Sequence, residues 1–390
     1  MKIAVGIDLI SCYVPQYYIN LSELANARNI DVNKYHVGIG QYKMAIPSAS
    51  EDIITMGATA ANQILKNYDR SKIGTVIFAT ETGVDLSKSA ATYIHSLLRL
   101  SSNCRAFEIK QACYSSTAAL QMACNIVRNH HQDQVLIIAS DIAFYGLNTS
   151  AEPTQGAGAV AFLVKNNPRI LRIDPCYGIY TQDILDFWRP NEQREAIVDG
   201  KYSAKMYLLS LEKAWNNYQL HSKRNYQDHD YFVYHAPLAR LVEKAHVFLA
   251  KQHVSKNIIQ LQSQIQDSLY YIREIGNTYS AALYISFISL LQSFTLNNVE
   301  VVNKRLAFYA YGSGSVAEVF SGVLQKDWQI IMQQNYRKML IAQRKALDIS
   351  QYEMIISQNQ PDNISKKYLS NHSDFYLEIN NKKRLYKKHI

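Results

Sequence analysis

Short apolar runs alternate with longer amphipathic stretches along this chain. Apolar residues at three- and four-residue spacing indicate helices, and compact apolar runs such as Thr75–Thr80 (TVIFAT) are typical of buried strands. The pattern predicts strands at Lys2–Ile7, Thr75–Thr80, Arg105–Ile109, Val135–Ala139, Ala159–Val164, Tyr231–Tyr234, Arg305–Tyr309 and Phe375–Ile379. It predicts helices at Asp52–Lys66, Ser87–Leu100, Ser115–Asn129, Leu238–Lys251 and Ser280–Ser293, from Val316 onward, and beyond about residue 325. Strands and helices in alternation predict an α/β layered fold.

Composition and length exclude several classes of protein. The 390 residues are 48% hydrophobic and 19% charged, enough for a large core and two or three domain-sized units, so most of the chain is not disordered. The five cysteines form no C-x-x-C pair, and no histidines have metal-ligand spacing. The apolar helix Ser280–Ser293 is shorter than a membrane span, and Asp8 interrupts the first apolar run. We expect a reduced, soluble, cytoplasmic protein without metal.

Charge adds little to this picture. The net charge is +9, but without the five bases of the last nine residues, Lys382–Ile390, it falls to +4. This tail is interpreted as a solvated end rather than a nucleic-acid arm, and it is short and lacks an aromatic stacking pattern. A mildly basic body suits an anionic small ligand as well as nucleic acid.

Three residues stand where chemistry is expected, just past the ends of predicted strands. Cys113 lies between a strand and a helix start, where unpaired amides and the helix dipole predict a lowered pKa and a nucleophile. Glu81 follows TVIFAT, where burial would raise its pKa toward that of a general base. His235 follows YFVY and suits an acid, a base or a hydrogen-bond donor. From the residues alone, a buried structural cysteine, a solvent-facing glutamate and a structural histidine remain open.

Two glycine-rich runs carry weaker signals. Gly312–Ser315 (GSGS) lets backbone amides approach a ligand, as in an oxyanion hole. Gly156–Ala159 (GAGA) is interpreted as a close packing turn. Neither run fits G-x-G-x-x-G or precedes a Walker-type lysine, which disfavours dinucleotide binding.

Eight long motifs occur in an order that resembles the 3-hydroxy-3-methylglutaryl-CoA (HMG-CoA) synthase family, above all its bacterial members. They are ATETGVD (Ala79–Asp85), EIKQACYSSTAA (Glu108–Ala119), ASDIAFYGLNTSAEPTQGAGAVA (Ala139–Ala161), DFWRP (Asp186–Pro190), VDGKYS (Val198–Ser203), YHAP (Tyr234–Pro237), GNTYSAALY (Gly276–Tyr284) and YGSGSVAE (Tyr311–Glu318). The resemblance covers nearly the whole chain. It implies the thiolase fold, two similar halves in a five-layered αβαβα arrangement, at residues 1–166 and 167–390. The second half would carry added helices and a C-terminal extension.

The resemblance also implies a homodimer that condenses acetyl-CoA with acetoacetyl-CoA in the mevalonate route, without a cofactor. Cys113 would be the acylated nucleophile, Glu81 the general base and acid, and His235 the third catalytic residue. The amides of Cys113 and Ser313 would be oxyanion donors. The implied substrate-binding residues are Tyr145, Thr154, Asn277, Ser313, Arg240 and Lys244, and the implied supports of the site are Asp85, Asp141, Asp186 and Asp199. Arg240 replaces a lysine of many relatives, and Phe144 replaces an arginine frequent in close ones.

Three other readings stay open at this point. A β-branching relative would condense acetyl units onto a ketone held by an acyl carrier protein, and an acidic carrier would also suit a basic surface. An initiating β-ketoacyl synthase uses Cys, His and Asn, which Cys113, His235 and Asn277 superficially satisfy. Glu81 argues against it, because decarboxylative condensation needs no carboxylate base. The last is an inactive binding module that kept the fold.

Overall fold

A computed structural model describes residues 3–254, 257–335, 341, 343–358 and 372–389. Its strands are β1 (Val5–Tyr13), β2 (Tyr17–Asn20), β3 (Lys43–Ile46), β4 (Ile73–Ala79), β5 (Arg105–Ile109), β6 (Gln134–Ala143), β7 (Gly156–Asn166), β8 (Leu171–Thr181), β9 (Phe187–Trp188), β10 (Ile197–Val198), β11 (Tyr231–Tyr234), β12 (Arg305–Gly312), β13 (Val316–Leu324), β14 (Lys345–Ala346), β15 (Phe375–Asn380) and β16 (Lys383–Lys388). Its helices are α1 (Leu21–Ala27), α2 (Ile53–Ile64), α3 (Ala90–Leu97), α4 (Ser115–Asn129), α5 (Gly200–Ser222), α6 (Ala239–Lys251), α7 (Ile258–Ser263), α8 (Gln266–Ile275), α9 (Ala282–Leu296), α10 (Trp328–Asn335) and α11 (Ile349–Gln358).

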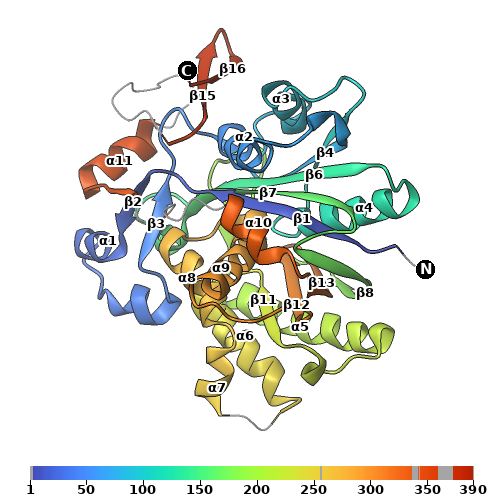
Figure 1. Cartoon of the computed structure of the whole chain (residues 1–390). Coiled ribbons are helices and arrows are strands. Elements are labelled where there is room, and N and C mark those ends of the chain that lie inside the picture. The colour runs from blue at the N-terminus through green and yellow to red at the C-terminus, as the bar shows by residue number, and fades with distance from the viewer. Residues whose placement is uncertain (1–2, 255–256, 336–340, 342, 359–371, 390) are drawn as a thin grey trace.

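The largest sheet of the described residues has the strand order β11-β12-β13-β8-β1-β7-β6-β4-β5 (Figure 1). The arrangement β4-β6-β7-β1 is repeated as β11-β12-β13-β8: in each, a parallel pair is followed by two antiparallel strands. Strands β1 and β8 meet over a short stretch where Gly6 pairs with Arg172. A Cβ atom at Gly6 would lie 1.9 Å from the carbonyl oxygen of Leu171, so only glycine permits this junction. The division at 166/167, between β7 and β8, stays a prediction.

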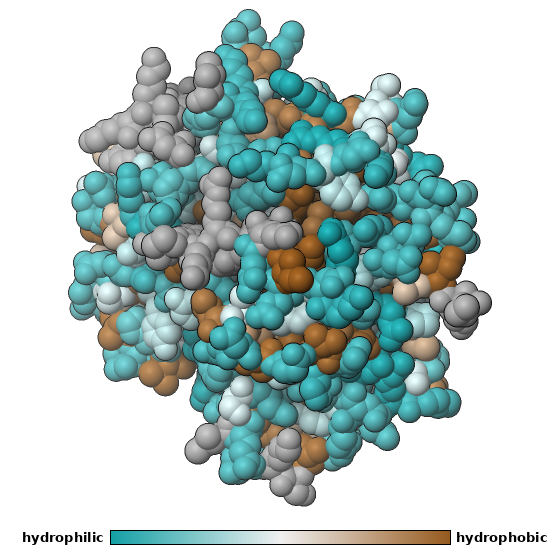
Figure 2. All heavy atoms as spheres, viewed as in Figure 1, coloured by the Kyte–Doolittle hydropathy of each residue, from teal (hydrophilic) through white to brown (hydrophobic). Residues whose placement is uncertain are grey.

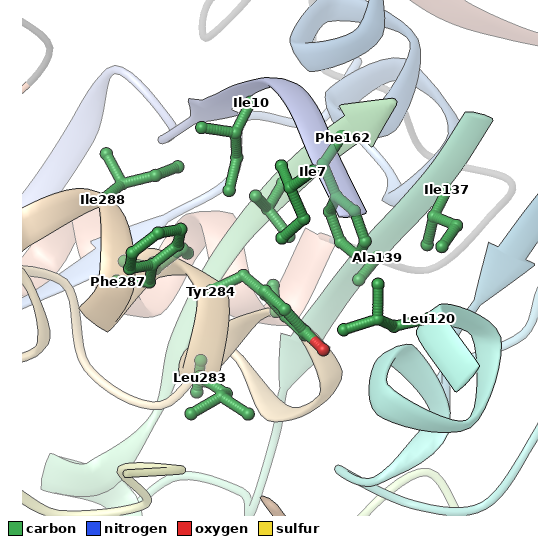
Figure 3. Close-up of a cluster of buried hydrophobic side chains, with 14 of the residues drawn as sticks. Ile7, Ile10, Leu120, Ile137, Ala139, Phe162, Leu283, Tyr284, Phe287 and Ile288 are labelled. Carbon is green, nitrogen blue, oxygen red and sulfur yellow. The ribbon is translucent and has the colours of Figure 1, made fainter. Parts of the chain in front are cut away.

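Helices α4 and α9 lie between the two parts of this sheet, and other helices cover its outer faces. In β6, Ile138 faces Gly57 of α2, whereas Ile137 and Ala139 lie on the side of Leu120 of α4 (Figure 3). In β12, Phe308 packs against Phe287 of α9 and Tyr309 against Tyr207 of α5. Because successive strand residues point to opposite faces, these contacts define five layers: α2, sheet, α4 with α9, sheet, α5.

Tyr284 of α9 shows how closely the central layer is packed. Its ring stacks on Phe162 of β7 with centroids 4.6 Å apart, and its hydroxyl lies 3.0 Å from Oγ1 of Thr117 on α4 (Figure 3). The segment Tyr279–Leu296 is long and apolar enough to cross a membrane, but 78% of it is buried inside the protein. It is therefore the central core helix. On the face of the molecule shown in Figure 2, hydrophilic side chains predominate.

One predicted helix is a strand. The segment from Val316 forms β13, and neighbouring β8 was not predicted either. Apolar residues of β13 fall at Val316, Val319, Phe320 and Val323, a helix-like spacing. This happens because β13 is an inner strand whose faces are covered by α5 on one side and α4 on the other, and it therefore shows no apolar–polar alternation.

Other boundaries shift for local reasons. Helix α4 and strands β5 and β11 have the predicted limits, and β1 begins at Val5 and runs to Tyr13. The helix expected from Ser87 begins only at Ala90, because the carboxylate of Asp85 accepts hydrogen bonds from the amides of Ser87 and Lys88 and forms a turn. Beyond residue 325 the structure has α10, α11 and β14, and residues 336–340, 342 and 359–371 lie outside the described part.

The basic C-terminal tail is not a free solvated end. Strand β16 pairs with β15 in a hairpin beside α2 and α3, at the top of Figure 1. The Tyr386 hydroxyl donates to Oδ2 of Asp52 at 2.6 Å, and Nη1 of Arg384 lies 3.0 Å from the same oxygen. Asp52 caps the N-terminus of α2, so the tail is anchored to the helix that covers the sheet.

Candidate active site

A cavity of about 530 Å³ opens where the strands of both halves end. Eight of the residues singled out from the sequence line it: Cys113, Tyr145, Thr154, His235, Arg240, Lys244, Asn277 and Ser313. Its volume is in the range of small-molecule sites. Glu81 adjoins it through Cys113, whose Sγ donates to Oε2 of Glu81 at 3.4 Å. Residues far apart in the sequence therefore form one site.

A tight, strained turn places Cys113 at the start of α4. The preceding residue, Ala112, has φ of 44°, a left-handed conformation that costs a non-glycine residue about 1 kcal/mol. The Ser115 hydroxyl stabilises the turn, accepting from the Gln111 amide at 2.7 Å and donating to the Ala112 carbonyl at 2.6 Å. Strain retained at a nucleophile is typical of functional sites.

The electrostatics of the Cys113–Glu81 pair differ from the expectation for the cysteine. Burial, the nearby charges of Glu81 and Asp141, and the hydrogen bond to Glu81 raise the pKa of the Cys113 thiol well above its usual value. The predicted lowering by the helix dipole is wrong, because these effects outweigh it. The prediction for Glu81 agrees with the structure: burial first, then the charge of Asp141, raise its pKa to about 8. A neutral thiol thus faces a carboxyl group that titrates near neutrality.

Asp141 fixes the loop that carries Glu81. Its Oδ1 accepts hydrogen bonds from the backbone amides of Glu81 and Thr82, both at 3.0 Å, and from the hydroxyls of Thr80 and Thr82, both at 2.6 Å. Its Oδ2 accepts from the amide and hydroxyl of Ser280, just before α9. One buried carboxylate therefore joins the end of β4 to the start of α9.

His235 follows β11 as Glu81 follows β4, the equivalent strand of the repeat. Its amide donates to the Tyr309 carbonyl at 2.7 Å, and its carbonyl accepts from the Tyr207 hydroxyl at 2.6 Å. Burial lowers the pKa of the imidazole to about 3. The ring is therefore neutral near pH 7, and a neutral imidazole has one N–H donor and one acceptor nitrogen.

A close contact between two loops sets the position of Asn277. A Cβ atom at Gly276 would lie 1.9 Å from the Gln155 carbonyl oxygen, and the φ of Gly276 is 88°. The Gln155 side chain in turn accepts from the Tyr145 amide at 2.8 Å. Tyr145, Thr154 and Asn277 thereby line one wall of the cavity. Gly156 packs on the same loop, in agreement with the packing role predicted for the GAGA run.

Asp186 holds a second part of the site in place. Its carboxylate accepts from the Gly314 amide, the Tyr311 hydroxyl and the Ser203 hydroxyl, all at 2.9 Å. These bonds join the glycine-rich loop to the first turn of α5, which Asp199 caps. Asp186 and Asp199 thus hold a loop and a helix of the site, and their supporting role in the reaction stays a prediction. The hydrogen bonds that the structure describes for the exposed Asp85 lie within its own turn.

Basic side chains surround the cavity mouth. Arg240 and Lys244 project from α6 and Lys205 from α5. Nη1 of Arg240 is 2.6 Å from Oε2 of Glu243, whereas neither Lys244 nor Lys205 forms an ion pair with another described residue. The mouth therefore attracts anionic groups.

Sequence reasoning missed several residues of the site. The cavity is also lined by Phe187, Lys205, Tyr207 and Tyr279, and Arg189 donates to the Glu81 carbonyl. Phe187 and Arg189 lie in the DFWRP motif and Tyr279 in GNTYSAALY, so motif position could have indicated them. Tyr279 has a left-handed φ of 45° three residues before α9, and Ala112, with φ of 44°, lies three residues before α4. Within the described residues, no group of three His, Cys, Asp or Glu side chains is arranged to hold a metal ion.

Comparison with known proteins assigns this arrangement to a class. The family model "Hydroxymethylglutaryl-coenzyme A synthase N terminal" matches residues 2–168, and the C-terminal model matches residues 172–260 and 249–381. The chain therefore belongs to the hydroxymethylglutaryl-CoA synthase family. Hydroxymethylglutaryl-CoA synthase of Enterococcus faecalis is 38% identical over 98% of this chain and 99% of its own.

Two further proteins refine the comparison. A solved structure of MvaS in complex with 3-hydroxy-3-methylglutaryl coenzyme A has a TM-score of 0.92 and 32% identity over all of both chains. This similarity confirms the predicted thiolase-like fold. The polyketide biosynthesis 3-hydroxy-3-methylglutaryl-ACP synthase PksG of Bacillus subtilis is 32% identical over 90% of this chain and 88% of its own.

Proposed function

We propose that this protein condenses acetyl-CoA with acetoacetyl-CoA and releases 3-hydroxy-3-methylglutaryl-CoA and CoA. The observation that carries the proposal is the 3.4 Å contact between Cys113 Sγ and Glu81 Oε2, in a cavity also lined by His235. A thiol nucleophile, a carboxylate base and a neutral imidazole donor are the groups that this reaction needs.

In the first step, Cys113 gives its proton to Glu81 and attacks the acetyl-CoA carbonyl carbon. The bond between the acetyl carbonyl carbon and the CoA sulfur breaks, and the leaving CoA thiolate takes the proton from Glu81, which is again a carboxylate. In the wild type, the carboxylate that helps raise the pKa of the Cys113 thiol is also the group that accepts the proton of that thiol. The acetyl group stays activated as a thioester on Cys113.

In the second step, the Glu81 carboxylate removes a proton from the acetyl methyl group. Backbone amides of Cys113 and Ser313 stabilise the enolate oxygen, and the new carbanion attacks the ketone of acetoacetyl-CoA. His235 donates a hydrogen bond to that ketone oxygen, which takes the proton held by Glu81 and becomes the tertiary hydroxyl, with Tyr145 and Asn277 beside the acetoacetyl group. Water then cleaves the Cys113 thioester to give the carboxylate of the product and a free thiol.

A carrier-bound ketone is the second candidate substrate, as the name of PksG indicates for that relative. Free CoA thioesters are favoured here by the higher identity to the Enterococcus faecalis enzyme and by Arg240, Lys244 and Lys205 at the cavity mouth, which suit the CoA phosphates. We further propose that the protein works as a homodimer in the cytoplasm, in the mevalonate route, and needs no metal or redox cofactor.

The test is acetyl-CoA-dependent loss of acetoacetyl-CoA absorbance, with intact-mass detection of acetyl-enzyme. We expect turnover and an acetyl adduct in the wild type, and neither in Cys113→Ala. Cys124→Ala, in a buried cysteine of the same helix α4, is the matched control and should behave as the wild type. An adduct without turnover on free acetoacetyl-CoA would favour the carrier-dependent reaction. Absence of any adduct would refute the covalent mechanism.

A further inference from the structure

Glu318 is a buried acid that the mechanism above does not use. It lies in β13 with 1% of its surface exposed, and no described lysine, arginine or histidine forms an ion pair with it. A buried carboxylate without a cation destabilises a fold unless its hydrogen bonds compensate, so its presence calls for a role other than stability.

Both oxygens of Glu318 bind the helix of the nucleophile. Oε2 accepts from the Tyr114 hydroxyl and Oε1 from Nε2 of Gln121, each at 2.6 Å. Tyr114 is the residue after Cys113 and the N-cap of α4, and Gln121 lies two turns further along. Two short bonds from one side chain therefore fix both the position and the rotation of the start of α4 against β13.

The same strand leads back to the second oxyanion donor. Gly312 pairs with Val316, and Ser313 and Gly314 connect β12 to β13. A Cβ atom at Gly312 would lie 2.7 Å from the Gln111 carbonyl oxygen and from Cβ of Tyr114, so this loop touches the nucleophile turn directly. We infer that Glu318, acting through Tyr114, is a positioning residue that aligns the Cys113 amide with the Ser313 amide. The inference rests on the proposed function.

The protonation state of Glu318 decides whether both bonds persist. A carboxylate accepts from two donors, whereas a carboxylic acid carries a proton on one oxygen and loses one of these acceptor sites. The other titratable groups around the pair are Cys124 on α4, Tyr284 on α9 and Tyr177 on β8. Burial raises the pKa of Cys124 to about 12 and raises that of Tyr284, and both are neutral near pH 7. Burial raises the pKa of Glu318 to about 7, so this group titrates in the working range.

Glu318→Gln keeps the shape of the side chain and removes its charge. We expect kcat to fall about ten-fold with KM nearly unchanged, because a small misplacement of reacting groups lowers the rate. Below about pH 7, log kcat/KM of the wild type should fall by about one unit more than protonation of Glu81 alone gives, since protonated Glu318 loses the acceptor site that the variant also lacks. The variant should show only the fall that protonation of Glu81 gives. Its thermal midpoint at pH 8 should rise, because a group with a raised native pKa costs stability once ionised.

A double-mutant cycle with Tyr114→Phe separates positioning from a general effect on the fold. If Glu318 acts through Tyr114, the fall in kcat of the double variant should be smaller than the product of the falls in the two single variants. Asp174→Asn is the control: Asp174 on β8 is a buried carboxylate that pairs with Arg305 and should change stability without changing the pH profile. Wild-type kcat in Glu318→Gln, multiplicative losses, or an unfolded Glu318→Gln beside a fully active Tyr114→Phe would overturn the inference. A wild type without turnover would instead refute the proposed function.

Discussion

The thiol of Cys113 points at the carboxylate of Glu81, its hydrogen-bond acceptor at 3.4 Å. The two residues lie in the loops that follow β5 and β4, which are parallel neighbours. Burial raises the pKa of both groups; the hydrogen bond from Cys113 offsets part of the rise for Glu81, whereas the charge of Glu81 raises the pKa of Cys113 further. The nucleophile and the base therefore share one proton rather than titrating separately.

Replacing Glu81 separates the two steps of the reaction. Glu81→Ala should slow condensation at least about 100-fold, because no carboxylate removes the methyl proton. Cys113 should still acquire an acetyl group, since loss of the neighbouring charge makes its thiolate easier to form. Acetoacetyl-CoA consumption measures the first effect and intact mass the second. Condensation at the wild-type rate would show that another group is the base.

Asp141→Asn should change both pH dependence and stability. The charge of Asp141 raises the pKa of Glu81, so its removal should move the acid limb of kcat/KM from about pH 8 to lower pH. The amide cannot accept all the hydrogen bonds that Asp141 receives, and the free energy of unfolding should fall by about 2 kcal/mol. Asp85→Asn, in an exposed turn, is the control and should change neither quantity. If the acid limb of kcat/KM in Asp141→Asn stayed at the wild-type pH, the charge of Asp141 would not be what raises the pKa of Glu81.

Lys244 is expected to contribute more to substrate affinity than Arg240. Arg240 is already paired with Glu243, whereas Lys244 is exposed at the mouth. Lys244→Ala should raise KM for both CoA thioesters several-fold with little change in kcat, and salt should weaken the effect. Lys251→Ala, at the end of the same helix and not among the cavity residues, should leave KM unchanged. Equal effects of Lys244→Ala and Lys251→Ala would argue against a specific contact.

The C-terminal hairpin should matter for stability and not for turnover. Tyr386→Phe removes the hydroxyl bound to Asp52 and should cost about 1 kcal/mol of unfolding free energy. Deletion of residues 382–390 removes the Arg384 contact as well and should cost more, with kcat at 25 °C unchanged. Urea denaturation and steady-state kinetics on the same samples measure both. A fall in kcat that tracks no loss of folded protein would link the hairpin to the site.

The sequence pattern predicts an element correctly where the residues of that element alone determine its secondary structure. Helix α4 has the predicted limits, Ser115–Asn129, because an alanine-rich amphipathic run begins right after the turn at Cys113. The three catalytic candidates were identified from their places at strand ends, and the cavity brings Cys113 and His235 together.

What sequence reasoning missed depends on contacts between distant segments. Strand β13 was taken for a helix because α5 covers one of its faces and α4 the other, which no local pattern reveals. The lowered pKa expected of Cys113 considered only its own helix, whereas Glu81 and Asp141 approach from other strands. The hydrogen bond between Asp52 and Tyr386 joins residues 334 positions apart, a contact that no local pattern predicts.

The geometry of the active site depends on the absence of a side chain at Gly6. Any side chain there would push β8 away from β1. The strand set that precedes His235 would then move away from the set that precedes Glu81 and Cys113. A residue that never contacts a substrate can thus be as intolerant of substitution as the nucleophile, since the reacting groups belong to two strand sets that are joined where β1 and β8 pair at Gly6.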